Sequence, residues 1–439
     1  MELTAEYGFF VGIDWATEAH QVTVVDPRGN VLNERSVPHS GAAITELIDW
    51  LIARADGDTG RIAVAIEVPR GALVEMLYER GIAVYSINPK QLDRLRDRHT
   101  VAGAKDDRLD AYVLGDSLRT DLPLFRRVKI DDPVSIQLRE FSRLHDDLRE
   151  ELSRLTNRLR DQLYRFFPQM LRLCPAANEP WFWDLVKRVP SPARAAVLRP
   201  ATIRAVLQKH RIRRLTAEDV LTQLRTPPVR VAPGTLEAAR GHIEMLLPRL
   251  QLVHAQQQAN DKRLQGLLEK LGSVEADDQG QKHEHRDAAI ILSMPGIGIH
   301  VAATMLGEAA QALAERDYDA LRTHSGQAPV TRRSGKRKLV LRRRACNSAL
   351  ADALYHAARV HVQRDPAANA LYAAHRQQGA SHGRALRSIG DRMLRILVAM
   401  LRTRTLYDPD RIGRTRSQPA DPSSQAADLI VHVPAGIAA

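Results

Sequence analysis

The sequence predicts an α/β domain at the amino terminus, a long helical arm after it, and a mostly helical domain toward the carboxyl terminus. Short apolar runs alternate with helical segments over residues 8–87, and apolar residues recur at spacings of three and four in two long stretches further on. Because a chain of 439 residues exceeds what one hydrophobic core can organise, we expect separate domains. We place them at residues 1–125, 126–287 and 288–408, followed by a disordered tail at 409–439.

The α/β domain is predicted from apolar runs bounded by turn residues. Residues 26–30, Asp-Pro-Arg-Gly-Asn, separate two such runs, which indicates an antiparallel meander. Later runs alternate with helical segments, which indicates an α/β sheet. The expected elements are strands at Phe9–Ile13, Gln21–Val25 and Val31–Val37, a helix at Ala42–Ala55, a strand at Ile62–Ile66, a helix at Gly71–Tyr78 and a strand at Ala83–Ile87.

Two amphipathic stretches form the expected arm. From Leu138 to Phe166, Leu and Phe recur every three or four residues amid Arg, Glu and Asp, a pattern typical of a coiled-coil helix. The stretch from Leu236 to Leu271 is similar, although Pro248 should start, break or kink that helix. The two helices could pair antiparallel within one chain or between chains. Between them, about Cys174 to Pro233, lies a region rich in Pro and basic residues to which the sequence assigns no chemistry.

The carboxyl-terminal domain is expected to be mostly helical. Asn347–Val360 and Ile389–Leu401 are apolar amphipathic helices, which favours a place in the core. The Pro-Gly-Ile-Gly turn at 295–298 joins two helical segments, and it either exposes backbone N–H groups to a DNA backbone or forms a plain corner. A loop at 272–287 precedes this domain, and the residues after 408 lose all periodicity.

Composition narrows the class of protein. Hydrophobic residues make up 44% and charged residues 26% of the chain, which is ordinary globular composition. The net charge of +12 favours a polyanionic partner but does not distinguish DNA from RNA. Cys174 and Cys346 are expected to be free thiols. Since no window is long and apolar enough to cross a bilayer, we expect no membrane partner and a cytoplasmic protein.

Acidic residues are candidates for a metal site. Asp14 and Glu67 each follow a predicted strand, at the sheet edge where sites are built. Asp107 and Asp110 lie one helical turn apart, so they share a face and repel each other unless a cation lies between them. Together the acids offer the hard oxygen ligands that Mg²⁺ or Mn²⁺ prefers in phosphoryl transfer. Each acid alone is more often a cap or a solvated side chain, so the prediction rests on the set.

A basic segment contains a candidate nucleophile, Ser334, followed by Gly335. Eight of the fourteen residues from Thr331 to Arg344 are Arg or Lys. Guanidinium groups would stabilise charge on a phosphate and on an attacking serine oxygen. From chemistry alone, a loop hydroxyl that contacts a phosphate is the simpler interpretation. The expected nucleic-acid-binding residues are Arg332, Arg333, Lys336, Arg337, Lys338, Arg342, Arg343 and Arg344.

Over most of its length the chain resembles the DEDD transposases of insertion-sequence family one-hundred-ten, also described as bridge-RNA-guided recombinases. The amino-terminal half matches at the strand Gly-Ile-Asp ending on Asp14, at the strand ending on Glu67, and at the Lys-x-Asp-x-x-Asp-Ala signature that begins at Lys105. The carboxyl-terminal half matches at residues 295–298, at Gly326–Pro329, at Ser334-Gly335 and at Asn347-Ser348.

The resemblance implies a RuvC-like (RNase H-like) fold for residues 1 to about 125 and a metal role for the four acids. It implies that Ser334 attacks a DNA phosphate to form a phosphoserine intermediate, with the acids of one protomer facing the serine of another. It further implies donor and target DNA, a structured noncoding guide RNA, and a homo-oligomer, either a dimer or a tetramer. His324-Ser325 stands where many relatives have an aromatic-Ala pair, which makes Ser325 a weaker rival nucleophile.

Three hypotheses therefore compete. The leading one is a serine-dependent DNA recombinase that also needs a divalent metal. The second is a metal-only RuvC-like endonuclease that cleaves particular DNA structures, in which Ser334 only contacts phosphate. The third is a nonenzymatic nucleic-acid-binding protein on a decayed RuvC scaffold, which would tolerate loss of the acids. The presence of the whole acid set places this third hypothesis last.

Overall fold

The computed structural model of the chain describes residues 7–98, 106–129, 131–232, 234–272, 286–335 and 337–410. The chain divides into two compact units, residues 1–131 and 132–439. The predicted loop at 272–287 and the predicted tail at 409–439 lie almost entirely outside the described residues. No helix in the described part of the chain combines the length and the apolarity needed to span a membrane.

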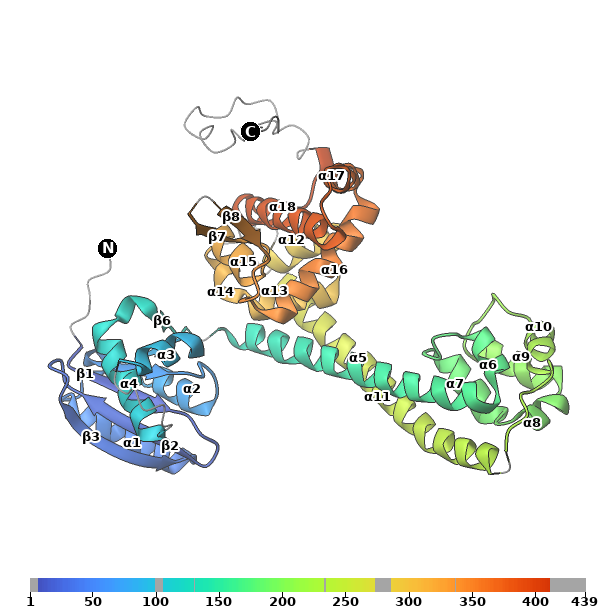
Figure 1. Ribbon diagram of the computed structural model, residues 1–439, viewed down its shortest axis with the longest axis horizontal. Coiled ribbons are helices and arrows are strands. Elements are labelled where there is room, and N and C mark those ends of the chain that lie inside the picture. Colours follow the sequence, from blue (N-terminus) through green and yellow to red (C-terminus); the bar gives the residue numbers. More distant parts are fainter. Residues whose placement is uncertain are drawn as a thin grey trace, which may run out of the picture. The chain divides into compact units, whose positions relative to one another are not determined.

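The first unit is an α/β domain built on one mixed sheet (Figure 1). Six strands lie in the order β3-β2-β1-β4-β5-β6. The first three strands pair antiparallel, β1, β4 and β5 are parallel, and β6 is antiparallel to β5. The elements are β1 (Phe9–Asp14), β2 (Ala19–Val25), β3 (Val31–Pro38), α1 (Gly41–Arg54), η1 (Thr59–Arg61), β4 (Ile62–Ile66), α2 (Ala72–Glu79), β5 (Ala83–Ser86), α3 (Pro89–Arg96), α4 (Asp107–Thr120), η2 (Leu122–Leu124) and β6 (Arg126–Arg127).

Helices cover both faces of this sheet because successive side chains of a strand point to opposite sides. Val11 and Ile13 of β1 belong to the core that contains Leu47 of α1 and the apolar face of α2. Phe10 belongs to the core on the other face, with Leu114 of α4 and the apolar side chains of α3. The predicted strands and helices of this unit are confirmed, whereas α3 and β6 were not predicted.

The second unit is mostly helical. Its longest helices, α5 (Pro133–Phe166) and α11 (Thr235–Gly272), pack side by side (Figure 1). The amide of Asn260 on α11 donates to the backbone oxygen of Phe141 on α5 at 2.9 Å, and Arg249 on α11 pairs with Glu151 on α5 at 3.9 Å. Residue numbers that rise along one helix thus fall along the other, so the two helices are antiparallel.

The elements of this unit run from α5 to α18 in chain order. They are α5 (Pro133–Phe166), α6 (Pro168–Leu173), α7 (Pro180–Arg188), α8 (Pro192–Ala196), α9 (Pro200–Lys209), α10 (Ala217–Leu224), α11 (Thr235–Gly272), α12 (Asp287–Ser293), α13 (Ile299–Glu308), α14 (Ala310–Ala314), α15 (Tyr318–His324), β7 (Val330–Ser334), β8 (Arg337–Leu341), α16 (Ser348–Arg364), α17 (Pro366–Gln377) and α18 (His382–Thr403).

The region between the long helices has its own hydrophobic core, which α6 to α10 form with parts of α5 and α11. Trp181, Phe182 and Trp183 are all at most 1% exposed. The indole of Trp183 donates to the backbone oxygen of Ala177 at 2.7 Å, and that of Trp181 donates to Glu179 at 2.8 Å. This aromatic run therefore builds the core, because buried indoles need both apolar contacts and a hydrogen-bond acceptor.

The helix α11 corrects one prediction. We expected Pro248 to start, break or kink a helix, but α11 runs from Thr235 to Gly272 with Pro248 inside it, so the expected start or break is wrong. A proline inside a helix removes one backbone hydrogen bond and costs about 3 kcal/mol. Leu246, Leu247 and Leu250 are buried on both sides of it, and their burial offsets that cost.

The carboxyl-terminal helices enclose a second core, to which the start of α5 and the end of α11 also contribute. The predicted core helices are confirmed as α16 and α18. Glu308 at the end of α13 accepts from Arg143 of α5 at 2.7 and 3.2 Å and from the amide of Asn347 at 2.6 Å. Asn347 also caps α16 by accepting from the backbone N–H of Leu350. One buried carboxylate thus joins three helices.

Candidate active-site residues

Two acidic side chains lie at the carboxyl ends of neighbouring strands. The strands β1 and β4 pair in parallel with Ile13 opposite Ile66. Asp14 ends β1 and Glu67 directly follows β4, so the two residues are neighbours at one edge of the sheet. Both side chains are half-buried. This is the edge at which parallel strands of α/β sheets present their functional side chains.

The helix α4 crosses β1 with its backbone in direct contact with the strand. A Cβ atom added to Gly12 would lie 1.8 Å from the carbonyl oxygen of Ala111 and 2.5 Å from the amide nitrogen of Gly115. Near the end of α4, Arg119 donates to the backbone oxygen of Pro27 at 3.4 Å, in the turn beyond the far end of β2. The first turn of α4 therefore lies toward the carboxyl end of β1.

That first turn contains Asp107 and Asp110, which places them toward the same sheet edge as the strand-end acids. Asp106 caps the helix by accepting from the backbone N–H of Arg108 at 3.1 Å. Asp107 is exposed, whereas Asp110 is 4% exposed. The guanidinium group of Arg96 donates to Asp110 at 2.6 Å. A buried carboxylate needs such a cation or a metal ion to offset its desolvation.

The four acids supply a donor set of the right chemistry for a hard divalent cation, because carboxylate oxygens are the ligands that Mg²⁺ and Mn²⁺ prefer. Within the described residues, no three of these carboxylates come within 4.8 Å of one another. Metal binding would therefore require the carboxylates to move closer together, and Arg96 would compete with the ion for Asp110. Lys105, the first residue of the predicted signature, lies outside the described residues.

Ser334 is the last residue of β7, in an exposed β-hairpin. The hairpin pairs β7 with β8 and closes on the pair Ser334 and Arg337. Gly335 follows with a φ of +55°, a conformation that glycine adopts without steric cost. The side chain of Ser334 is exposed. The sequence predicted no strands around Ser334, and the structure places it at the tip of a two-stranded sheet.

Several arginines in and just after this hairpin have no acidic partner among the described residues. Within the described part of the chain, no ion pair with a carboxylate is found for Arg332, Arg333, Arg342 or Arg344. Arg343 donates to the backbone oxygen of Ala328 at 3.3 Å. Arg337 and Lys338 belong to β8, and Lys336 lies outside the described residues. Unpaired guanidinium groups on an exposed hairpin favour contact with phosphate.

Ser325 is fully buried, in contrast to Ser334. It is 0% exposed, and its hydroxyl oxygen has no hydrogen-bond partner among the described residues. Ser325 lines a cavity of about 250 Å³ together with Arg342, Tyr355 and Arg387. Because a nucleophile must reach its phosphate, this burial argues against Ser325 as the rival nucleophile that its sequence position suggested.

Two further arginines were not predicted from the sequence. Arg387 lines the Ser325 cavity, and burial together with the charges of Arg342 and Arg384 lowers its pKa. In the described structure none of these three side chains has a carboxylate partner. Arg384 and Arg387 lie one turn apart at the start of α18. This spacing is the only feature of the sequence that could have indicated a cluster of arginines here. Their mutual repulsion would be relieved by an anion.

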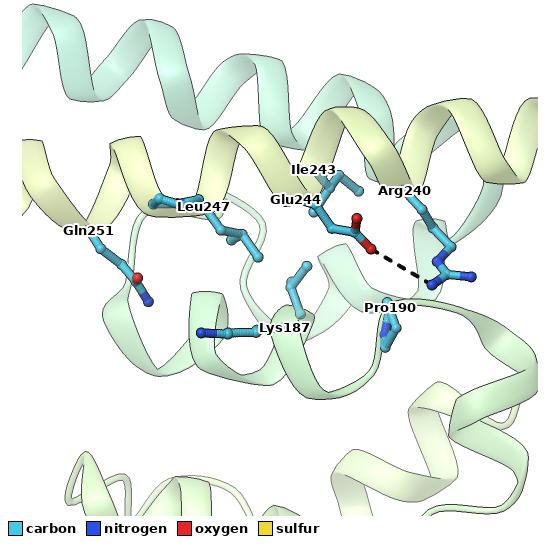
Figure 2. A pocket seen from close by; sticks show the side chains of 9 residues that line it. Lys187, Pro190, Arg240, Ile243, Glu244, Leu247 and Gln251 are labelled. Carbon is cyan, nitrogen blue, oxygen red and sulfur yellow. Dashed lines mark ion pairs between the residues drawn. The ribbon is translucent and has the colours of Figure 1, made fainter.

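A smaller cavity of about 130 Å³ lies between α7 and α11 and contains none of the candidate residues (Figure 2). Val186 and Lys187 contribute from α7, and Leu247 from α11. At one end Arg240 and Glu244 form an ion pair at 3.7 Å. Its lining residues offer no hydroxyl or thiol group and only one carboxylate, that of Glu244, so they form no set of metal ligands.

Comparison with known proteins gives matches at both ends of the chain. A family model described as a transposase matches residues 11–168, and the model of the transposase IS116/IS110/IS902 family matches residues 288–373. The "Mini-circle putative transposase for IS117" of Streptomyces coelicolor is 32% identical over 92% of this chain and 96% of its own length.

Other curated relatives agree. The "Putative transposase y4uE" of Sinorhizobium fredii is 48% identical over 49% of this chain and 60% of its own length. The "Insertion element IS110 uncharacterized 43.6 kDa protein" of Streptomyces coelicolor is 27% identical over 92% of this chain and 96% of its own length.

Proposed function

Since the chain belongs to the IS116/IS110/IS902 family of transposases, we propose that it cleaves and exchanges DNA strands through a covalent phosphoserine intermediate at Ser334. The observation that carries the proposal is the exposed hydroxyl of Ser334 at the tip of a hairpin, beside Arg332 and Arg333, which have no carboxylate partner among the described residues. A nucleophile so placed can reach a phosphate, and the surrounding cations favour the anionic transition state.

The proposed step is a phosphoryl transfer to serine. The hydroxyl oxygen of Ser334 attacks the phosphorus of one DNA strand, an Oγ–P bond forms, and the bond from phosphorus to one sugar oxygen breaks. The serine proton leaves to solvent or to a base, and the released sugar oxygen takes up a proton. In the reverse sense, a sugar oxygen of a second strand displaces the serine, which joins the strands. Arg332, Arg333 and Arg342 hold the phosphate oxygens through these steps.

The acids of the first unit form the second part of the proposal. Asp14, Glu67, Asp107 and Asp110 would hold Mg²⁺ or Mn²⁺, which would neutralise charge on phosphate oxygens when bound. The strand order and the position of the acids at the ends of β1, of β4 and in the first turn of α4 support a RuvC-like arrangement. The long pair of α5 and α11 likewise supports a coiled-coil arm, through the heptad-like spacing of its buried residues.

Guide RNA and oligomerisation complete the proposal, and they rest on the family resemblance. The resemblance implies a structured noncoding RNA that pairs with donor and target DNA, and a dimer or tetramer in which acids and serine of different protomers meet. The net charge of +12 is compatible with binding both nucleic acids. The metal-only endonuclease remains the alternative, in which water attacks and Ser334 only contacts phosphate.

One experiment distinguishes the serine recombinase from the metal-only endonuclease. It uses purified protein, labelled donor and target DNA, Mg²⁺ and the RNA transcribed from the flanking DNA. Denaturing electrophoresis detects both cleaved strands and a protein–DNA adduct. We expect an adduct with the wild-type protein and with Ser325→Ala, none with Ser334→Ala, and loss of cleavage with Asp14→Asn. Cleaved DNA without an adduct in every variant that retains the acids would favour the metal-only endonuclease.

A further inference from the structure

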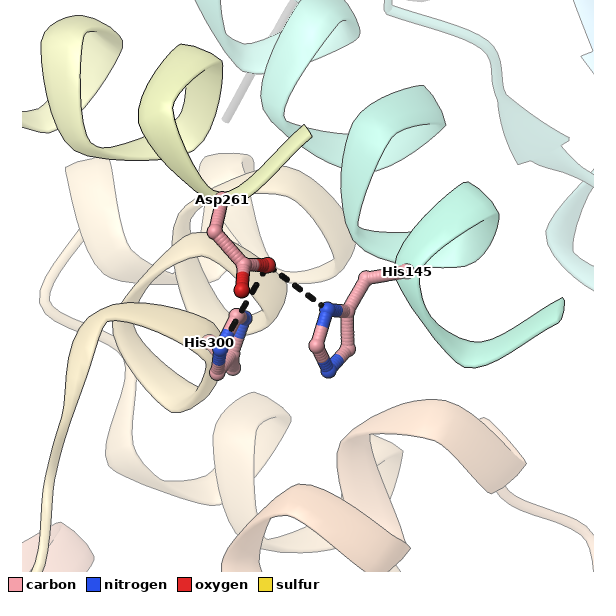
Figure 3. Close-up of side chains that lie close together, drawn as sticks. All are labelled: His145, Asp261 and His300. Atoms are coloured by element: carbon pink, nitrogen blue, oxygen red, sulfur yellow. Dashed lines mark hydrogen bonds and ion pairs between the residues drawn. The ribbon is translucent and has the colours of Figure 1, made fainter. Parts of the chain in front are cut away.

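Two histidines and an aspartate from three different helices meet in the second unit (Figure 3). His145 lies on α5, Asp261 on α11 and His300 in the first turn of α13. One ligand atom of each residue lies within 4.8 Å of the others. These side chains belong neither to the proposed acid site of the first unit nor to the Ser334 hairpin.

The geometry of this cluster fits a tetrahedral transition-metal ion. The carboxylate oxygen Oδ1 of Asp261 lies 3.0 Å from Nδ1 of His145 and 3.8 Å from Nε2 of His300. In a tetrahedral zinc site, metal–ligand bonds near 2.0–2.1 Å put neighbouring ligand atoms roughly 3.3 Å apart. These two separations bracket that value. The imidazole rings of His145 and His300 stack with their centroids 3.7 Å apart, so they would have to rotate away from each other before all three atoms could bind one ion.

Ligand type determines which metal such a cluster takes. Imidazole nitrogen binds Zn²⁺ and related transition metals well, whereas Mg²⁺ prefers oxygen ligands and retains its water. The cluster contributes two imidazoles and one carboxylate, and the side chains of Asp261 and His300 remain 40% and 45% exposed. Solvent can therefore reach the fourth position of the ion. We propose that His145, Asp261 and His300 form a zinc site with one open coordination position.

The site would join the arm helices to the domain that contains Ser334. His300 begins α13 immediately after the Pro-Gly-Ile-Gly turn, and α13 ends at Glu308, which α5 and α16 also contact. An ion bound to α5, α11 and α13 would thus hold both long helices against α13. A competing explanation is metal-free packing, because the two imidazole rings also stack with centroids 3.7 Å apart and His145 can hydrogen-bond Asp261 directly.

Metal analysis of the full chain distinguishes the two explanations without depending on DNA cleavage. After incubation with Zn²⁺ and dialysis against Mg²⁺ buffer, we expect about one bound zinc per chain in the wild-type protein. His145→Gln and His300→Gln should lower zinc affinity at least about tenfold, because each removes a metal ligand. His242→Gln is the matched control, since His242 lies on α11, the helix of Asp261, but outside the cluster.

Cobalt absorption and thermal stability test the zinc site independently of the metal analysis. Co²⁺ in place of zinc should give the intense visible absorption of a tetrahedral nitrogen–oxygen site in the wild type and in His242→Gln, and lose it in His300→Gln. Zinc should raise the melting temperature of the wild type but not of the two ligand variants. Wild-type protein that retains no zinc, or variants that bind zinc as tightly as the wild type, would overturn the proposal.

Discussion

The backbone of Gly12 in β1 lies directly against the carbonyl oxygen of Ala111 in α4, with room for hydrogen but not for a methyl group. This contact sets how far α4 approaches the sheet, and it thereby positions Asp107 and Asp110 relative to the strand-end acids. An additional carbon 1.8 Å from that oxygen would force the helix away from the strand.

Gly12→Ala should therefore destabilise the protein. Overpacking at a site closed by backbone atoms costs about 1–3 kcal/mol or more, measurable by urea denaturation of the wild type and the variant. Gly41→Ala is the matched control, because a Cβ atom on Gly41 meets nothing within 4 Å. Equal stability of both variants would contradict the described contact between α4 and β1.

The ion pair between Arg96 and Asp110 gives a second prediction, on metal affinity. If Asp110 is a metal ligand, Arg96 competes with the cation for the same carboxylate. Arg96→Gln should then lower the Mn²⁺ concentration for half-maximal binding several-fold in a titration of the purified protein. Arg94→Gln serves as control, since Arg94 is exposed on the same helix. Unchanged or weaker Mn²⁺ binding in Arg96→Gln would argue that Asp110 has a purely structural role.

A third prediction concerns pH and His361. Burial of the imidazole lowers the pKa of His361, and the charge of Arg392 lowers it further. The hydrogen bond to Pro295 and the charge of Asp365 act in the opposite direction, but the net shift is downward. The side chain is 4% exposed, and Nδ1 donates to the backbone oxygen of Pro295 at 2.7 Å. Since the folded pKa lies below the unfolded one, the unfolded state binds the extra proton. The contribution of His361 to folding stability is therefore fully present above its ordinary pKa of 6.5, and it is lost as the pH falls from that value toward the lower folded pKa.

The measurement is the free energy of unfolding between roughly pH 7.5 and 5.5, the range in which histidines titrate. His361→Gln keeps a donor for Pro295 and removes the titrating group, so its stability should depend less on pH than that of the wild type. His356→Gln, an exposed position on the same helix, should retain the wild-type slope. A steeper slope in His361→Gln would contradict the assignment.

The cluster of Arg342, Arg384 and Arg387 gives a fourth prediction. Arg387→Gln should leave folding stability equal or slightly higher, because it removes a partly buried cation that is repelled by two others. It should also weaken binding to DNA or RNA and reduce the salt dependence of that binding, since one fewer phosphate contact releases fewer counterions. Arg204→Gln, which breaks an exposed pair with Glu218, should leave both properties near the wild-type values. Wild-type affinity and salt slope in Arg387→Gln would exclude this cluster from the nucleic-acid interface.

The sequence predicted the amino-terminal strands well because short apolar runs end on a turn or an acid there. Asp14 and Glu67 were placed at the carboxyl ends of strands for that reason, and the parallel register of Ile13 and Ile66 shows that these two strand ends are adjacent. The helix α3 was missed because Leu92 and Leu95 are its only apolar residues, which is too weak a period for a short helix.

Other features depend on tertiary structure that no local pattern encodes. The hairpin of β7 and β8 was missed because its many charged residues interrupt the apolar residues, so that no alternation typical of a strand can be recognised. Ser325 is as polar in sequence as Ser334, and only packing reveals that it is buried. The zinc cluster is formed by three residues that lie far apart in the sequence, His145, Asp261 and His300. No spacing within a single motif therefore indicates it.

The central claim, a covalent bond between Ser334 and DNA, is tested most directly by locating the attachment in a trapped adduct. The wild-type protein is incubated with DNA, Mg²⁺ and the flanking RNA, the DNA is digested to a short remnant, and the proteolytic peptides are analysed by mass spectrometry. We expect the nucleotide mass on the peptide that contains Ser334. An adduct on any other residue, or strand exchange that proceeds without an adduct, would contradict the account.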